Sequence, residues 1–310
     1  MIDVSIVLPV HNEVGHLESE ISRIRGAMDM SPYLYEIIVV DDGSTDGSGE
    51  LLETIDKIRL IRFGQNRGCG TARRIGTQAA RGDTVVWTDV DMSYPNDTIP
   101  ALVRELEGHD QVVGARTREA GTHRTIRRMA KWSVRRLASY LIETPIPDLN
   151  SGMRAFRRPV ANQFLHQLPT GFSCVTTLTM TFLASGYSVH YLPIDYHQRA
   201  GVSKFHWYRD TRLFLLQVLR MMLTYNPLRV FVPVGLAFLG IGGVKLLVDV
   251  VTRDFAVAAN TLVLLFVGMQ TITLGLLADL MGRLTSRPLE VDPVNLQAPA
   301  RELRAPVHEA

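Results

Sequence analysis

The stretch Thr84-Val85-Val86-Trp87-Thr88-Asp89-Val90-Asp91 decides the fold of this chain. Its start is β-branched or aromatic, which is typical of a buried strand, and the strand ends in two carboxylates. Ligands of α/β folds bind beyond the carboxyl ends of the strands, so both acids are expected at a ligand site. Carboxylates at this spacing can hold a hard divalent cation, which commonly neutralises phosphates. Acidic pairs are also frequent in turns, so the interpretation depends on the surrounding sequence.

Strand and helix patterns alternate around this stretch. Strand patterns cover residues 4–8, 36–40, 58–63, 84–88 and 111–115, and helix patterns cover 13–28, 47–55, 71–80 and 98–106. The alternation predicts an α/β fold with an open, mostly parallel sheet and helices on both faces. Polar segments follow the first, second and fourth strands, and we expect them to meet at one edge of the sheet.

Two of these segments have alternative interpretations. Asp42-Gly43-Ser44 is also what a turn followed by a helix N-cap requires. Gly68 and Gly70 precede a predicted helix, where they would permit close backbone approach and leave N–H donors free for a phosphate. Convergence on one cleft favours the ligand-binding interpretation.

Length and composition limit the class of protein. With 310 residues the chain has room for one large or two modest domains, and 33 basic against 31 acidic residues give no field that favours nucleic acid. Its two cysteines, Cys69 and Cys174, cannot build a disulfide framework and suit a reducing compartment. The N-terminus leads straight into a strand, so no signal peptide is expected.

Two apolar stretches near the C-terminus have the composition of membrane spans. Residues 255–277 carry no charged side chain, and roughly 20 apolar residues cross a bilayer. Residues 230–244 are long enough only if the span extends through Lys245 and Asp249, which lie four apart and can pair or snorkel toward an interface. Two buried core helices are the alternative, and the length of the uncharged stretch favours membrane spans.

The charges around these stretches predict the topology. Arginines flank the pair at Arg209, Arg212, Arg220 and Arg229 before it and at Arg283 and Arg287 after it. The positive-inside rule places both flanks in the cytoplasm. We therefore expect a cytoplasmic α/β domain over 1–204, an interfacial helix over 205–227, a two-helix transmembrane hairpin over 228–281, and a disordered cytoplasmic tail over 282–310.

Residues 124–142 are predicted to form a basic amphipathic helix. Its cationic face carries Arg124, Arg128, Lys131 and Arg135. Such a helix is typical of an anionic membrane surface, and Arg135 and Ser139, four residues apart, can both reach one phosphate. An ordinary solvated helix is the alternative, but the basic residues lack acidic partners within the segment.

The order of the motifs resembles that of the inverting family 2 glycosyltransferases, which have the GT-A fold. The matching motifs are Pro9-x-x-Asn12-Glu13, Asp41-Asp42-Gly43-Ser44, Asn66-x-Gly68-x-Gly70-x-Ala72, Gly82-Asp83 and Asp89-x-Asp91. Two further motifs, Asp148-x-x-Ser151-Gly152-x-Arg154 and Arg199-x-Gly201-x-Ser203-Lys204, are similar to those of enzymes that make polyprenyl-phosphate sugars. These are the dolichol-phosphate mannose synthases and the bacterial polyisoprenyl-phosphate glycosyltransferases. The resemblance covers about residues 1–230 and, with the two spans, nearly the whole ordered chain.

The resemblance implies a role for each matching residue. The nucleotide sugar would be bound by Pro9, His11, Glu13, Asp41, Asp42, Gly70 and Asp89. Asp89 and Asp91 would hold Mg²⁺ or Mn²⁺ on the diphosphate. The acceptor phosphate would be bound by Arg124, Arg128, Lys131, Arg135, Ser139 and Ser203. The sugar would be positioned by Asn150, Ser151 and Arg154, with Asp148 and Arg154 near the reacting carbon. The catalytic residues would be Asp91, Asp148, Arg199 and Lys204.

Three residues depart from the family pattern. His11 stands where a Tyr is usual, Cys69 replaces a frequent Lys, and Ser93 stands where many relatives have a metal-contacting Gln. These departures leave three points open: the side chain that stacks on the base, one cation near the phosphates, and the third protein ligand of the metal.

The implied activity is inverting transfer of a hexose from a UDP- or GDP-sugar to a polyprenyl phosphate, undecaprenyl or dolichyl, on the cytoplasmic leaflet. A phosphate monoester has its second pKa near ~6 and needs positioning more than deprotonation. Asp148 is therefore a weaker candidate for a general base, and it would instead orient Arg154 or the sugar.

Other functions are compatible with parts of this sequence. A different lipid or a glycan hydroxyl as acceptor, and a non-catalytic membrane scaffold with a degenerate GT-A domain, are the alternatives. A processive polysaccharide synthase would need a Gln-x-x-Arg-Trp motif, and a dinucleotide oxidoreductase a Gly-x-Gly-x-x-Gly motif after the first strand; the sequence lacks both. The sugar, the base, the polyprenol, the pathway and the oligomeric state are left open, since related proteins include monomers and tetramers.

Overall fold

The structure is a computed structural model of the chain that describes residues 2–117, 139, 145–197, 223, 226–252 and 256–285. The chain divides into two compact units, Met1–Val230 and Phe231–Ala310.

The first unit is built on a sheet that has seven strands among the described residues, in the order β3-β2-β1-β4-β6-β5-β7. The strands are β1 Val4–Val10, β2 Tyr35–Asp41, β3 Arg59–Arg62, β4 Thr84–Trp87, β5 Gln111–Arg116, β6 Arg154–Arg157 and β7 Val189–Ile194. β6 runs antiparallel to both β4 and β5, and the other neighbours are parallel. The mostly parallel sheet is as predicted.

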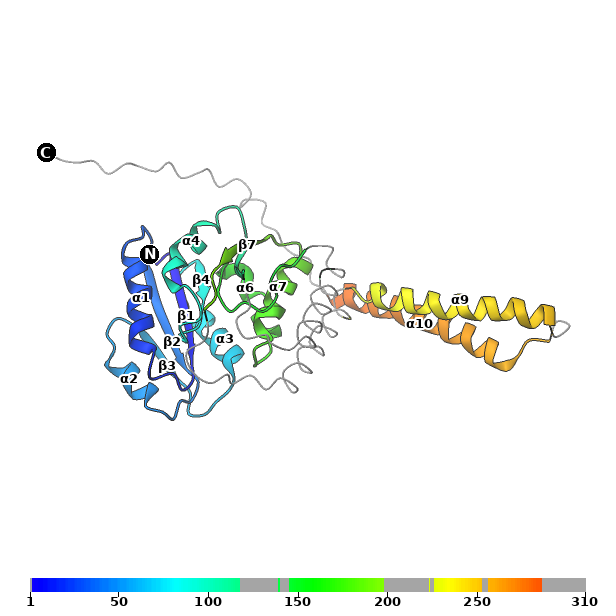
Figure 1. Cartoon of the computed structure of the whole chain (residues 1–310), viewed down its shortest axis with the longest axis horizontal. Coiled ribbons are helices and arrows are strands. Elements are labelled where there is room, and N and C mark those ends of the chain that lie inside the picture. The colour runs from blue at the N-terminus through cyan, green and yellow to red at the C-terminus, as the bar shows by residue number, and fades with distance from the viewer. Residues whose placement is uncertain are drawn as a thin grey trace. The chain divides into compact units, whose positions relative to one another are not determined.

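Helices cover both faces of this sheet. They are α1 Leu17–Asp29, α2 Ser48–Thr54, α3 Cys69–Ala79, α4 Ile99–Arg104, α6 Arg158–Asn162 and α7 Cys174–Ala184, with short 3-10 turns at Asn96–Thr98 and Leu165–Gln167. Successive strand residues point to opposite faces, so Ile6 of β1 shares a buried cluster with Leu17 of α1, whereas Val7 shares one with Ala72 of α3 and Leu178 of α7. Figure 1 shows α1 on one side of the strands and α3 and α7 on the other.

Two parts of this unit differ from the sequence expectation. The first helix begins at Leu17 rather than near Glu13, because the backbone amides of residues 12–14 bond to side chains of another loop. β6, β7, α6 and α7 had no counterpart among the predicted elements. α7 is buried over most of its surface and includes four buried threonines, so it has little amphipathic period to detect.

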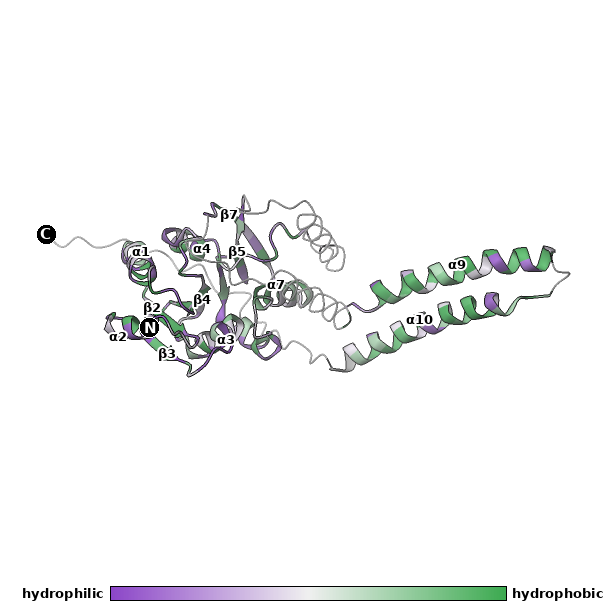
Figure 2. Ribbon diagram, turned by 60° about the horizontal axis from the view of Figure 1, so that its bottom comes forward, coloured by the Kyte–Doolittle hydropathy of each residue, from purple (hydrophilic) through white to green (hydrophobic). Residues whose placement is uncertain are grey.

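The second unit is a pair of long apolar helices, α9 Leu228–Thr252 and α10 Ala259–Thr285. Only 11% and 17% of their most apolar windows are buried, and both are long and apolar enough to cross a membrane. Figure 2 shows the two helices side by side and mostly hydrophobic. α10 begins at Ala259, four residues later than the predicted start of the second span.

Glycines and one acidic side chain join the two helices. A Cβ on Gly235 would lie 2.5 Å from Ile272 Cγ1, and a Cβ on Gly268 would lie 2.8 Å from Leu239 Cγ, so the backbones approach closely at both positions. Lys245 Nζ lies 3.5 Å from Asp249 Oδ1, so of the two alternatives that the sequence left open, pairing or snorkelling, the structure shows pairing. Asp249 also accepts a hydrogen bond from the backbone of Ala258 at 3.2 Å and thereby fastens the start of α10.

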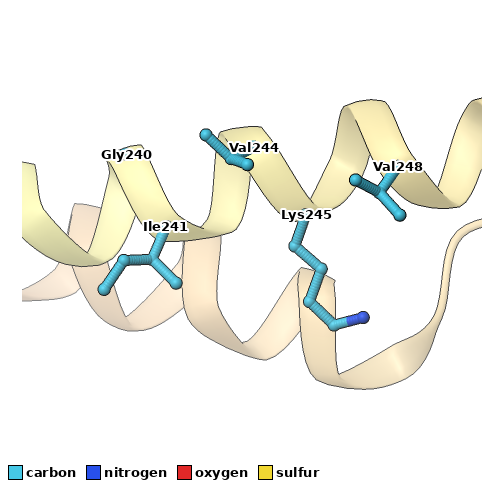
Figure 3. A pocket seen from close by; sticks show the side chains of 5 residues that line it. All are labelled: Gly240, Ile241, Val244, Lys245 and Val248. Atoms are coloured by element: carbon cyan, nitrogen blue, oxygen red, sulfur yellow. The ribbon is translucent and has the colours of Figure 1, made fainter.

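A groove on α9 is lined by Gly240, Ile241, Val244, Lys245 and Val248 (Figure 3). Its lining is apolar except for Lys245, which is paired with Asp249. The groove contains none of the carboxylates that the sequence singles out, and the candidate site lies in the other unit.

Candidate active site

Three parallel strands bring the predicted polar segments to one edge of the sheet. The register pairs Val10 of β1 with Asp41 of β2, and Val7 of β1 with Trp87 of β4. The residues that follow each strand therefore leave the same edge, as the sequence predicted. Pro9 lies inside β1, opposite Val40 of β2.

The loops after β1 and β2 hold each other in place. The Asn12 and Glu13 amides donate to the hydroxyls of Ser44 and Ser48, each at 3.0 Å. The Thr45 amide donates to Asn12 Oδ1 at 2.8 Å, and Asn12 has a positive φ of 53°, which Asn tolerates. These bonds cross-link the two loops that the family motifs mark as the nucleotide site. His11 and Glu13 are half-buried on this edge.

Asp41 and Asp42 are buried and bonded to the protein. Asp41 lies 3.2 Å from Arg62 and accepts a hydrogen bond from the Ser44 amide at 2.9 Å. Asp42 accepts from the amides of Arg67 at 2.6 Å and Gly68 at 2.9 Å. Burial raises the pKa of Asp42 although both amides act to lower it. Both carboxylates thus shape the loops around the expected nucleotide position.

Gly68, just before α3, and Gly70, in its first turn, do not leave their amides free for a phosphate, so that prediction is wrong. The Gly68 amide donates to Asp42, and the Gly70 amide donates to the Thr170 carbonyl at 2.7 Å. A Cβ on Gly70 would lie 2.1 Å from the carbonyl oxygen of Pro169. The backbone of residues 169–171 makes the close approach that these glycines allow, and it packs against the start of α3.

The acid pair after β4 is asymmetric. Asp89 is 33% exposed and its Oδ1 lies 2.6 Å from Nη2 of Arg73, a side chain that is only 3% exposed. Asp91 is 5% exposed, and its Oδ1 accepts hydrogen bonds from the Ser93 amide at 3.1 Å and from the Ser93 hydroxyl. Ser93 is itself fully buried and bonded to Asp91, so its hydroxyl supports an acid rather than replacing the Gln of the family pattern.

The two acids fit a cation that is held jointly with a phosphate. The described residues contain no group of three or more His, Cys, Asp or Glu side chains able to enclose a metal ion. Mg²⁺ is commonly bound by one or two carboxylates together with substrate phosphates and water. Asp89 and Asp91 supply that number of carboxylates, and Asp89 is the more exposed of the two, at 33% against 5%.

The segment at residues 148–154 packs directly against the acid pair. The Gly152 amide donates to the Tyr94 hydroxyl at 2.6 Å, and a Cβ on Gly152 would lie 2.8 Å from Asp89 Oδ2. Two motifs that lie about sixty residues apart in the sequence are thus in contact. Asn150 is exposed, and its Oδ1 accepts a hydrogen bond from the Thr176 hydroxyl at 2.9 Å.

Arg154 does not pair with Asp148, although Asp148 was expected to orient either Arg154 or the sugar. Arg154 is fully buried and donates to the Val175 carbonyl at 2.5 Å, to Thr179 at 2.8 Å and to the Ser151 carbonyl. Its guanidinium therefore ties the segment at 148–154 to α7, and a place for Arg154 near the reacting carbon stays a prediction. Ser151 is also fully buried.

Asp148 is paired with Arg116, at the end of β5, rather than with Arg154. The guanidinium donates to both carboxylate oxygens, with Nε–Oδ2 at 2.7 Å and Nη2–Oδ1 at 2.9 Å. Burial acts to raise the pKa of Asp148, but the hydrogen bonds and charge of Arg116 outweigh it and hold the pKa below its ordinary value. A carboxylate held ionised in this way is a poor proton acceptor, which agrees with the weak expectation for a general base.

The sequence did not point to Arg73, Arg116 or the tyrosines beside them. The rings of Tyr94 and Tyr196 meet edge to face at 5.1 Å, and the Arg116 guanidinium lies 5.2 Å from the centre of the Tyr196 ring. All of these contacts join residues far apart in the chain. The sequence offers one local signal for Arg73. It lies four residues after Cys69, which stands where the family frequently has a Lys, so the two residues share one face of α3.

Several predicted site residues lie outside the described residues. They are Arg199, Ser203 and Lys204 of the loop motif and Arg124, Arg128, Lys131 and Arg135 of the basic helix. The described chain approaches both segments. The His197 amide donates to the Ser93 carbonyl at 2.9 Å, beside the acid pair. The Ser139 hydroxyl accepts a hydrogen bond from the Ile146 amide at 3.2 Å, two residues before Asp148.

Sequence comparison identifies the class of protein that this fold and acid pair define. Residues 5–165 match the family described as Glycosyl transferase family 2, and residues 226–284 match the one described as GtrB C-terminal hairpin. The chain belongs to glycosyl transferase family 2 and is an enzyme of the glycosyltransferase type.

Its relatives are similar over almost their whole length. The undecaprenyl-phosphate 4-deoxy-4-formamido-L-arabinose transferase of Pseudomonas fluorescens (strain SBW25) is 30% identical, with 91% of this chain and 85% of that protein covered. The protein of that name from Aeromonas hydrophila is also 30% identical, covering 91% and 89%.

A solved structure has the same fold. The glucosyl-3-phosphoglycerate synthase of Mycobacterium tuberculosis, in complex with Mn²⁺, UDP and phosphoglyceric acid, aligns with a TM-score of 0.58 at 24% identity. The alignment covers 71% of this chain and 78% of that one. This likeness confirms the predicted GT-A fold.

Gly152→Ala is expected to lower turnover by about a hundredfold, since a misplacement of about 1 Å at a reacting site can cost that much. The new methyl group would meet Asp89 Oδ2 at 2.8 Å, and Asp89 is held by a buried arginine, so the carboxylate must shift and strain its ion pair. Steady-state kinetics measures the effect. Gly26→Ala in α1 is the control, because a Cβ there meets nothing within 4 Å. Wild-type turnover in Gly152→Ala would contradict the proposed packing.

Proposed function

We propose that this enzyme transfers a sugar from a nucleoside-diphosphate sugar to a polyprenyl phosphate, with inversion at the anomeric carbon. One observation carries the proposal. The Asp89 and Asp91 edge, with the segment at 148–154 packed against it, occurs in a chain that aligns along 91% of its length, apolar hairpin included, with transferases named for undecaprenyl phosphate. A soluble hydroxyl acceptor would not require that hairpin.

A divalent cation, Mg²⁺ or Mn²⁺, is proposed at Asp89 and Asp91. Bound there, it would neutralise charge on the diphosphate leaving group. Mn²⁺ and UDP are bound in the structure of the mycobacterial synthase, so a UDP-sugar is the first donor to test and a GDP-sugar the second. The described acids supply two carboxylates, and the diphosphate and water would complete the ligand set.

The chain's own residues would act mainly by positioning charge. Asp91 and Asp89 hold the donor end, and Arg199 and Lys204 would stabilise the negative charge that grows on the leaving diphosphate. The attacking phosphate is ionised near neutral pH, with a second pKa of ~6, so no residue has to remove its proton. Asp148 accordingly serves to hold Arg116, which ends β5 at the same edge of the sheet.

The membrane arrangement follows from the same assignment. We propose that α9 and α10 cross the membrane and that the catalytic unit and the C-terminal tail face the cytoplasm, since arginines flank the hairpin on that side. The basic helix at 124–142 would lie on the lipid surface and present Arg135 and Ser139 to the acceptor phosphate.

The test is a substrate screen with the full chain purified in detergent. UDP- and GDP-sugars are each incubated with undecaprenyl or dolichyl phosphate, with Mg²⁺, Mn²⁺ or EDTA, and products are identified by mass spectrometry. We expect one polyprenyl-phosphate sugar that requires a divalent cation. Donor binding without transfer to any lipid phosphate would point to another acceptor, and absence of both would support the non-catalytic scaffold.

A further inference from the structure

We propose that Arg73 is a positioning residue of the donor site: it holds one oxygen of Asp89 and thereby presents the other oxygen to a cation and a diphosphate. The inference rests on the proposed function in one respect, because it takes a divalent cation and a nucleoside diphosphate as the ligands of the acid pair. It does not depend on the identity of the acceptor or of the sugar.

Arg73 is fixed from several directions. Nη2 lies 2.6 Å from Asp89 Oδ1, Nη1 lies 3.7 Å from the sulfur of Cys174, and the guanidinium lies 5.6 Å from the centre of the Trp87 ring. These contacts come from the end of β4 and from α7, while Arg73 itself is on α3. A side chain that is 3% exposed and packed against both the end of β4 and α7 is held in place, so its position is defined before any ligand binds.

The two oxygens of Asp89 are divided between different neighbours. Oδ1 is paired with Arg73, whereas Oδ2 lies beside Gly152, where a Cβ would come within 2.8 Å of it and within 3.0 Å of Arg73 Nη2. The terminal torsion of an aspartate is broad, so an unpaired carboxylate would sample many orientations. The ion pair restricts that rotation and leaves Oδ2 on the side of the segment at 148–154. Preorganisation of this kind lowers the cost of binding.

Arg73 also supplies positive charge beside Asp89, two residues before Asp91. Asp89 and Asp91 repel each other, and a diphosphate would add further negative charge. A guanidinium is charged at every physiological pH, so Arg73 places a permanent positive charge 2.6 Å from Asp89 Oδ1. Cys69 stands where relatives frequently have a Lys. One helical turn later, on the same face of α3, Arg73 brings a cation to the acid pair instead.

The alternative is that Arg73 only ties α3 to its neighbours, in which case its loss would lower stability without acting through Asp89. A double-mutant cycle between Arg73 and Asp89 separates the two roles. The variants are Arg73→Met, Asp89→Asn and the pair together, with Arg73→Lys as the conservative change. Arg74→Met is the matched control, because the next residue on α3 points away from the buried face.

Calorimetric titration of each full-length variant in detergent, with UDP in the presence of Mn²⁺ and with Mn²⁺ alone, gives the readout, and thermal melting reports folding. We expect Arg73→Met to weaken Mn²⁺-dependent UDP binding by about tenfold to a hundredfold, the cost of one charge-assisted interaction. Arg73→Lys should lose less, Arg74→Met should bind as wild type, and Arg73→Met should add little in the Asp89→Asn background.

Wild-type binding by Arg73→Met, or an equal loss whether or not Asp89 is present, would overturn the inference. If Arg73→Met does not fold, Arg73→Lys is the deciding variant, because it keeps the positive charge but loses the forked guanidinium. Unchanged Mn²⁺-dependent UDP binding by Arg73→Lys would then overturn the inference. A wild-type protein that binds neither Mn²⁺ nor UDP would overturn both this inference and the proposed function. Binding with the expected pattern, but without transfer to polyprenyl phosphate, would support the role of Arg73 and contradict the proposed acceptor.

Discussion

Asp91→Ala is expected to abolish sugar transfer while leaving the protein folded and in the membrane. Asp91 follows β4 at the edge of the sheet, and Ser93 holds one of its oxygens, so its second oxygen has a defined position. Its removal leaves the acid pair with Asp89 alone, which is already paired with Arg73. We expect turnover to fall by about 10³-fold or more, as when a group that stabilises transition-state charge is lost.

The control is Asp56→Ala. Asp56 is exposed between α2 and β3, on the side where the parallel strands begin, so its removal changes the net charge equally but does not touch the candidate site. Transfer is measured with saturating donor, acceptor and metal, and membrane association by fractionation. Turnover near that of the wild type in Asp91→Ala, or activity that persists in EDTA, would contradict a metal-bound diphosphate at this edge.

The edge that carries the acid pair could be predicted because its signals are local. The β-branched run of β4 and the carboxylates after it are adjacent in the sequence, and the alternation of strands and helices requires a parallel sheet. Parallel strands share a carboxyl edge, so convergence of the polar segments follows from chain order alone. The register of β1 with β2 and β4 bears this out.

The differences between prediction and structure concern residues whose local sequence is compatible with two different contacts. Glycines at the start of a helix allow close approach of a phosphate or of another backbone. Here the backbone of the loop at 169–171, about a hundred residues from Gly70, makes that approach. Arg154 could face the site or the interior, and the carbonyls of α7 hold it in the interior. Asp148 could meet Arg154 or Arg116, and the strand pairing of β5 with β6 brings Arg116 within reach. None of these partners is visible in the local pattern.

Arg135→Ala is expected to raise the KM for polyprenyl phosphate by about tenfold to a hundredfold, with little effect on the KM for the nucleotide sugar. A charge-assisted hydrogen bond to the acceptor phosphate contributes about 1.5–3 kcal/mol, which corresponds to that range. Arg135 lies four residues before Ser139, whose hydroxyl meets the Ile146 amide just ahead of Asp148. This contact joins Ser139 to the loop just before the segment that packs against the acid pair, so we choose Arg135, four residues earlier, for the test of the predicted acceptor site.

Comparison with Arg199→Ala makes the assignment specific. Arg199 follows His197, whose amide is bonded beside the acid pair, so its loss should lower kcat by removing a partner of the leaving diphosphate. Arg104→Ala, which removes an exposed arginine at the end of α4, should change neither constant. Steady-state kinetics with each substrate varied in turn distinguishes these cases. If Arg135→Ala leaves the acceptor KM unchanged, or impairs only the donor, the basic helix serves as a membrane contact and the acceptor phosphate is bound by other residues.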